Sequence, residues 1–196
     1  DEERFEKIIS SNILKLGFEK TMINVIYPFL SKIGILWQTG AINPAQEHFI
    51  SNLVRQKLIA AIDGQYFVSS EKARKYILYL PEGELHELSL LFADYIIKSR
   101  NNRTVYLGQS LPFMDLTAVY DIHKPDYILS VITTTPGPSE IQAYVDRLSA
   151  SFPDAQVLLT GFQVVGQDVD APENVTIFTR LEQLIQFVEE NTMSIA

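Results

Sequence analysis

The sequence contains no cysteine. This absence excludes disulfide bonds, zinc sites with thiolate ligands, iron–sulfur clusters and a cysteine nucleophile. No uncharged stretch approaches the roughly 18 apolar residues of a membrane-spanning helix, and the charged first residues do not resemble a signal peptide. We therefore expect a cytoplasmic protein that does not enter the membrane, and the lack of cysteine fits a reducing compartment.

Basic residues are also scarce. The chain has 16 Lys and Arg against 24 Asp and Glu, which gives a net charge of −8. Residues 1–75 carry 10 basic and 8 acidic side chains, whereas residues 76–196 carry 6 and 16. Because no basic stripe exists, we do not expect this chain to bind nucleic acid on its own.

Helical periodicity dominates the first third of the chain. Apolar residues recur at helical spacing over about residues 3–16, 20–38 and 44–62, and Pro28 predicts a kink or break in the second helix. Asn43, Pro44 and Gln46 form the expected start of the third helix, with a side-chain cap and proline in the first turn. The short connection before it predicts an antiparallel helix pair.

The pattern changes after a connector at residues 64–74. Short apolar runs typical of buried parallel strands lie at residues 76–80, 104–107, 127–132, 156–160 and 175–178. Segments of helix length lie near residues 87–99, 112–123, 138–151 and 180–191. We therefore predict an α/β fold with two domains: a helical bundle at residues 1–75, and a doubly wound, flavodoxin-like five-stranded parallel sheet at residues 76–196.

A histidine follows the first predicted strand, where open α/β sheets bind ligands beyond the carboxyl ends of their strands. Glu84 stands two residues before His86 and is placed to accept a hydrogen bond from one ring nitrogen, which would fix the tautomer and raise the basicity of the other nitrogen. Other interpretations are simpler: a loop histidine is often solvated, and acidic residues favour helix N-termini. With three histidines in separate elements, a zinc hydrolase is excluded, and a single histidine suits a metal already held by a macrocycle.

Two motifs together carry a resemblance to a known family. Trp37 is followed after nine residues by Glu47 and His48, and the run Gly-Glu-Leu-His-Glu-Leu-Ser at residues 83–89 follows a strand. This pairing resembles the sensory region of cobalamin-dependent MerR-type transcriptional regulators, the CarH type of light-sensing repressors. The resemblance implies a helical bundle and a cobalamin-binding α/β domain, with cobalamin held between them.

The resemblance also implies roles for individual residues. His86 matches the lower axial ligand of cobalt, with Glu84 as the partner that orients it. Trp37, Glu47 and His48 match residues that cover the upper face, so adenosylcobalamin is the implied form of the cofactor. The residues that match contacts to the nucleotide tail are Ser130, Thr160 and Gly161.

The implied function is that of the ligand-sensing region of a MerR-family regulator, without enzymatic activity, whose homo-oligomerisation responds to the ligand. The chain begins within a predicted helix and without an initiator Met, so we expect a DNA-binding domain to precede Asp1 and to supply the contact with DNA. Light as the signal has less support, because Gln38 stands where the light-sensing members have a histidine that can bind cobalt after photolysis.

Two other functions stay open. One is a corrinoid carrier protein of a methyltransferase system, which shares the plan of a bundle followed by an α/β domain. The other is a degenerate domain used for oligomerisation or for another small ligand. It is motivated by Ser89, which replaces the glycine of the histidine motif, and by Thr160, which replaces the first residue of a Gly-Gly pair.

Overall fold

The computed structural model describes residues 1–68 and 73–192, so the expected connector at residues 64–74 lies partly outside the described residues. The chain forms two compact units, Asp1–Ala61 and Ile62–Ala196. The division falls near the end of the last helix of the first unit, ahead of the boundary at residue 75 that the sequence suggests.

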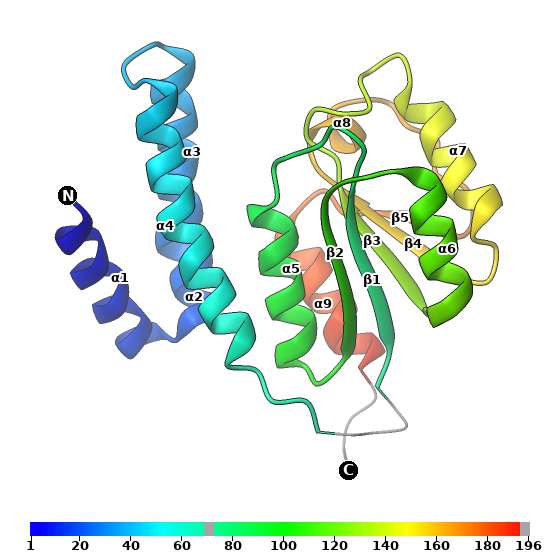
Figure 1. The fold of residues 1–196 in the computed structure, drawn as a ribbon, viewed down its shortest axis with the longest axis horizontal. Helices are drawn as coiled ribbons and strands as arrows, with labels where there is room; N and C mark the ends of the chain where they lie inside the picture. The colour runs from blue at the N-terminus through cyan, green and yellow to red at the C-terminus, as the bar shows by residue number, and fades with distance from the viewer. Residues whose placement is uncertain (69–72, 193–196) are drawn as a thin grey trace. The chain divides into compact units, whose positions relative to one another are not determined.

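The first unit is helical (Figure 1). Its elements are α1 (Glu2–Leu16), α2 (Phe18–Thr21), the π-helical η1 (Met22–Ile26), α3 (Tyr27–Gln38) and α4 (Pro44–Asp63), whose last residues pass into the second unit. A short turn reverses the chain between α3 and α4 (Figure 1). The predicted cap of α4 is present, because the backbone N–H of Gln46 donates to the Asn43 side chain and the backbone N–H of Asn43 donates to the Gln46 side chain, both at 3.0 Å.

Pro28 changes the helix in a different way from the predicted kink or break. It lacks an N–H group, so it cannot continue the regular hydrogen-bond ladder. The preceding turn widens instead: η1 is π-helical, and the backbone N–H of Tyr27 reaches the carbonyl of Met22, five residues back. The chain therefore runs from η1 directly into α3.

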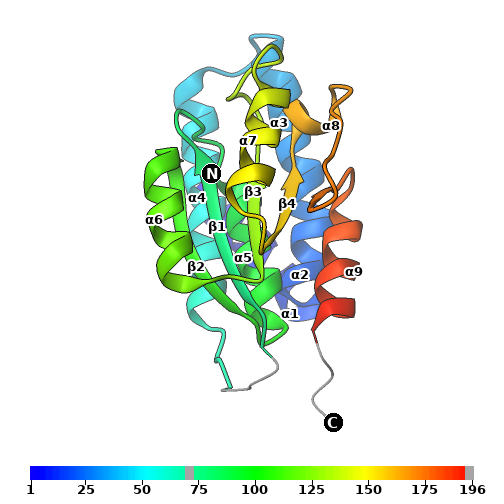
Figure 2. The same cartoon turned by 90° about the vertical axis from the view of Figure 1, so that its right-hand side faces the viewer.

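The second unit is the predicted flavodoxin-like fold. Within the described residues its sheet has five parallel strands in the order β2-β1-β3-β4-β5. The strands are β1 (Lys75–Pro81), β2 (Arg103–Leu111), β3 (Tyr127–Val131), β4 (Gln156–Thr160) and β5 (Val175–Ile177). Figure 2 shows β1, β3 and β4 from the side of α7.

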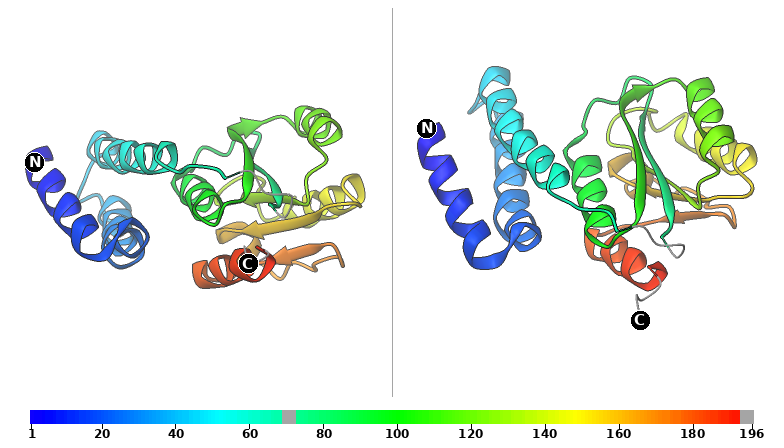
Figure 3. Two further views of the ribbon diagram at one scale, coloured as in Figure 1. Left: turned by 90° about the horizontal axis from the view of Figure 1, so that it is seen from below. Right: turned by 60° about the horizontal axis from the view of Figure 1, so that its bottom comes forward.

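Helices cover both faces of this sheet (Figure 3). They are α5 (Leu88–Ser99), α6 (Phe113–His123), α7 (Ile141–Ser151), α8 (Phe162–Val165) and α9 (Leu181–Asn191). α5 and α9 lie on one face, and α6 and α7 lie on the other (Figure 3). The described helices include none that is long and apolar enough to cross a membrane.

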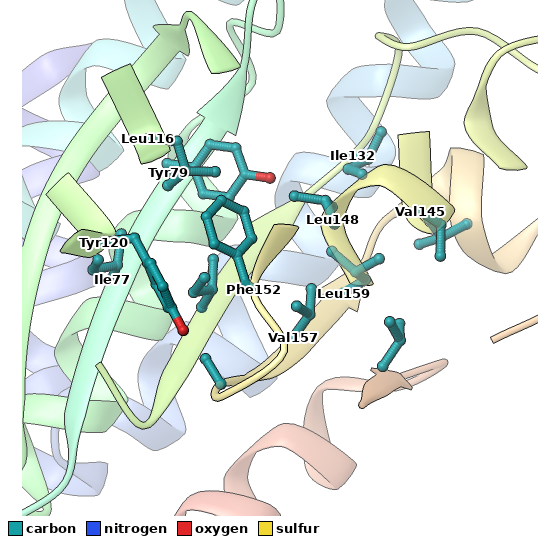
Figure 4. Packing of buried hydrophobic residues seen from close by; sticks show 14 of the residues in the cluster. Ile77, Tyr79, Leu116, Tyr120, Ile132, Val145, Leu148, Phe152, Val157 and Leu159 are labelled. Atoms are coloured by element: carbon teal, nitrogen blue, oxygen red, sulfur yellow. The ribbon is translucent and has the colours of Figure 1, made fainter. Parts of the chain in front are cut away.

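The main apolar core lies between the sheet and the α6 and α7 layer (Figure 4). Side chains alternate between the two faces of a strand, so every second residue of β1, β3 and β4 enters this core. The strand residues that share this face are Ile77, Tyr79, Ile128, Ile132, Val157 and Leu159. The chain runs from β1 to β2 on one side and continues from β3 on the other, which makes the carboxyl ends of β1 and β3 the topological switch point.

Candidate functional site

Glu84 is the centre of the loop that follows β1. Gly83 has a positive φ of 84°, and the backbone N–H of Glu84 donates to the Pro81 carbonyl at 2.9 Å, so a tight turn carries the chain back over the strand end. The Glu84 side chain is fully buried. A buried carboxylate needs several hydrogen-bond donors, and the two neighbouring loops provide them.

One carboxylate oxygen of Glu84 binds its own loop. Oε1 accepts hydrogen bonds from the backbone N–H of Leu85 at 3.0 Å and of His86 at 3.1 Å. It also lies 2.6 Å from Nδ1 of the His86 ring. The hydrogen bond that the Glu84–His86 spacing predicts is therefore present.

The other carboxylate oxygen binds the loop after β3. Oε2 accepts from the backbone N–H groups of Thr133, Thr134 and Thr135 at 2.9, 2.6 and 3.2 Å, and from the Thr134 hydroxyl at 3.1 Å. Three successive N–H groups make a nest that favours an anion. Glu84 thus joins the two loops at the switch point through a single side chain.

These hydrogen bonds keep Glu84 ionised. Burial alone would raise the pKa of its carboxyl group, but the hydrogen bonds from the Thr134 backbone, the His86 ring and the other loop N–H groups outweigh burial and lower the pKa from 4.5 to about 2. The ionised carboxylate can only accept a hydrogen bond from Nδ1, so Nδ1 carries a proton, and in the neutral tautomer of the ring this leaves the lone pair on Nε2.

The His86 ring lies at the surface of the protein. Its side chain is 62% exposed, while the Glu84 side chain that holds it is buried. A neutral imidazole with one nitrogen fixed by a carboxylate is the usual arrangement of a metal-binding histidine. The described residues contain no group of three or more His, Cys, Asp or Glu that could hold a metal ion, so a metal here would need most of its ligands from elsewhere.

Ser130, Thr160 and Gly161 lie at the carboxyl ends of β3 and β4. The Ser130 hydroxyl is buried and donates to the Tyr79 carbonyl at 2.9 Å, and the Thr160 hydroxyl donates to the Phe178 carbonyl at 2.8 Å. Both hydroxyls therefore hold neighbouring backbone segments in this structure.

Gly161 has a steric role instead. Its φ is +108°, and a Cβ atom there would lie 2.4 Å from the carbonyl oxygen of Ile132. The loops after β3 and β4 can approach each other this closely only because the residue is glycine.

Ser89, the residue that departs from the histidine motif, lies in the first turn of α5. A helical backbone accepts serine as well as glycine, so this replacement leaves the start of α5 intact.

Trp37, Glu47 and His48 belong to the first unit. Trp37 lies in the last turn of α3 and is 52% exposed, Glu47 lies in the first turn of α4, and His48 follows it. The Glu47 carboxylate lies 3.1 Å from Nδ1 of His48 and accepts a hydrogen bond from the Ser51 hydroxyl at 2.5 Å. The connecting turn thus brings these residues to one end of the α3–α4 pair.

The threonine N–H nest is the part of the site that the sequence did not reveal. Its donors are backbone N–H groups, which leave no mark in the side-chain pattern. Tyr79 was also not predicted to have a role: inside an apolar run it is indistinguishable from any other buried strand residue.

Residues 1–61 match the family model described as the B12 binding domain. The fold resembles that of the monomethylamine corrinoid protein of Methanosarcina barkeri, with a TM-score of 0.70 and 12% identity, over 94% of this chain and 89% of that one. It also resembles the methanol:cobalamin methyltransferase complex MtaBC of the same organism, with a TM-score of 0.50 and 11% identity, over 97% of this chain and 74% of that one.

A curated relative gives the more particular likeness. The chain is 25% identical over 153 residues to the HTH-type transcriptional repressor CarH of Myxococcus xanthus. The match covers 78% of this chain but 50% of the repressor, so the chain spans about half the length of that relative. The predicted resemblance to CarH-type repressors is therefore confirmed.

Proposed function

We propose that this chain binds cobalamin through His86 and acts as the ligand-sensing region of a transcriptional regulator. The observation that carries the proposal is the His86 ring, whose Nδ1 is held 2.6 Å from a buried, ionised carboxylate while the rest of the side chain is exposed. Support for the ligand comes from the B12 binding domain match, and support for the regulatory role comes from the similarity to CarH.

The residues present fit a corrin-bound cobalt. A corrin ring would supply most of the ligands of its cobalt, so one imidazole from this chain would be enough to hold the metal. His86 would supply this ligand, and Glu84 would hold its proton on Nδ1. Trp37, Glu47 and His48 would contact the upper ligand, and Ser130, Thr160 and Gly161 are the residues expected beside the nucleotide tail. When bound, adenosylcobalamin supplies a cobalt-bound adenosyl group whose loss would be the signal.

A corrinoid carrier is the second candidate, favoured by the fold similarity to the monomethylamine corrinoid protein. The two functions make different demands on the first unit. A carrier must expose the upper face of its corrinoid to partner enzymes, whereas a sensor of adenosylcobalamin benefits from a large aromatic side chain and polar groups that cover it. Trp37 with the Glu47–His48 pair supports the sensor.

Equilibrium binding tests the proposal. The purified protein is mixed with adenosylcobalamin in the dark, free ligand is removed, and the visible spectrum is recorded. We expect retained corrinoid with the spectrum of histidine-ligated cobalt, and we expect His86→Ala to change that spectrum. His123→Ala is the matched control, because His123 ends α6 and lies outside the proposed site. If the wild-type protein retains no corrinoid, the proposal fails.

The regulatory part needs its own measurement. We expect the molecular mass in size-exclusion chromatography to differ between the ligand-free protein and the dark adenosylcobalamin complex. Illumination of the complex then tests light as the signal. A mass that is independent of ligand would favour the carrier over the sensor.

A further inference from the structure

Tyr79 lies directly beside Ser130, the residue expected to meet the nucleotide tail. The two residues are partners in the pairing of β1 with β3, and theirs is the last pair before the strands separate at the switch point. Tyr79 shares its face of the sheet with Ile77, and Ser130 shares the same face with Ile128. Both Tyr79 and Ser130 are 0% exposed.

A partner on another element holds the Tyr79 ring in place. Its phenol shares a hydrogen bond of 2.9 Å with the phenol of Tyr144 in α7. The Tyr144 ring packs edge-on against Phe113 of α6, with 6.1 Å between ring centroids. Figure 4 shows the Tyr79 ring next to Leu116, within the core below α6 and α7.

Tyr79 is fully buried in this phenol pair, and Tyr144 is half-buried. Burial, followed by the neighbouring Tyr144 phenol, raises the pKa of Tyr79 well above its ordinary value, and the Ser130 hydroxyl opposes this effect. Burial likewise raises the pKa of Tyr144 to about 12. Moving the Tyr79 ring would break its hydrogen bond with Tyr144, and leaving the buried Tyr79 hydroxyl unpaired is costly.

Tyr79 therefore occupies the space beside Ser130 that the nucleotide tail of cobalamin would need. The Ser130 hydroxyl already donates to the Tyr79 carbonyl, and the Tyr79 side chain covers that face of the sheet. The loops after β3 and β4 also lie close together, because a Cβ atom at Gly161 would clash with the Ile132 backbone.

We propose that Tyr79 obstructs the nucleotide tail, so that this chain binds corrinoids without a tail more tightly than it binds cobalamin. This inference rests on the proposed corrinoid site at His86 and narrows its ligand class. The corrin ring of such a ligand would still reach His86, whose side chain is exposed. A ligand with a tail would first have to displace Tyr79 from Tyr144.

The test compares the affinities of two corrinoids that differ only in the nucleotide tail. Dissociation constants for adenosylcobinamide, which lacks the nucleotide, and for adenosylcobalamin are measured in the dark by spectral titration of the full chain. For the wild type we expect cobinamide to bind at least about tenfold more tightly, since exposing one buried hydrogen-bonded hydroxyl costs about that factor or more. Tyr79→Ala removes the ring, so the ratio should fall by at least about tenfold.

Control variants separate this effect from a general loss of stability. Ile77→Ala opens a cavity on the same face of β1, two residues before Tyr79, and should leave the ratio unchanged. Tyr79→Phe keeps the ring but removes the hydroxyl that bonds to Tyr144, so it should lower the ratio by less than Tyr79→Ala does. If Tyr79→Ala does not fold, Tyr79→Val carries the same expectation with a better strand former.

The outcomes distinguish this inference from the proposed function. Equal affinity for both ligands in the wild type, or a ratio that Tyr79→Ala leaves unchanged, overturns the role of Tyr79 and leaves the His86 site standing. If neither ligand binds the wild type or Tyr79→Ala, the corrinoid site itself is refuted and the inference falls with it.

Discussion

Glu84 carries a negative charge inside the protein and stabilises it by accepting hydrogen bonds from two loops. We expect Glu84→Gln to lower the free energy of unfolding by about 3 kcal/mol at neutral pH, the equivalent of lowering the pKa from 4.5 to about 2. The amide also places a donor where only acceptors fit. Glu82→Gln, at an exposed position of the same loop, should change stability by less than about 0.5 kcal/mol. Urea unfolding of the three proteins gives both values.

The Glu84 carboxylate also makes the free energy of unfolding depend on pH. Its folded pKa is below its unfolded pKa, so its stabilising contribution is complete above about pH 4.5 and is lost as the pH falls towards 2. The difference in unfolding free energy between wild type and Glu84→Gln should therefore shrink to less than half near about pH 3. A difference that stays constant over this range would contradict the assignment.

At the residue scale, the sequence predicted the contact between two residues that are close along the chain. Glu84 and His86 are two residues apart, so their hydrogen bond needs only a turn. The contacts of Glu84 with Thr133, Thr134 and Thr135 cross 49 to 51 positions of the chain. They depend on the strand order, and their donors are backbone groups common to almost all residues.

The loops after β3 and β4 meet at Gly161, which makes the connection between β4 and α8 sensitive to a single methyl group. Gly161→Ala would place a Cβ 2.4 Å from the Ile132 carbonyl at a φ of +108°. We expect it to lower the free energy of unfolding by about 3 kcal/mol, combining backbone strain with overpacking. Gly137→Ala is the control, since its Cβ would meet nothing within 4 Å. Equal effects of the two substitutions on the unfolding midpoint would contradict this account.

Helices and strands could be predicted where the spacing of apolar residues follows one period over the whole segment. Strands buried on both faces appear as apolar runs, and β1, β3 and β4 show this pattern over nearly their full length. β2 extends to Leu111, beyond the predicted run, because its register against β1 shifts near Gly108. α8 has four residues, too few for a helical period to show.

For the whole molecule, the sequence predicts correctly that a helical part precedes an α/β part. Trp37, Glu47 and His48 belong to the first unit, and Glu84 and His86 belong to the second. Within each unit the local geometry holds its own group together, through the Glu47–His48 contact in one and the Glu84–His86 contact in the other. A ligand that both groups recognise would couple the stabilities of the two units.

Hydrogen exchange measures this coupling directly. With adenosylcobalamin or adenosylcobinamide at about a hundred times the dissociation constant, a site gains about 2.7 kcal/mol of protection. We expect slower amide exchange in peptides around Glu84 and also in the peptide that joins α3 to α4. His86→Ala should abolish protection in both, because the ligand is then lost. Protection confined to the second unit would show that the corrinoid binds there without Trp37, and would leave the first unit with no part in sensing the upper ligand.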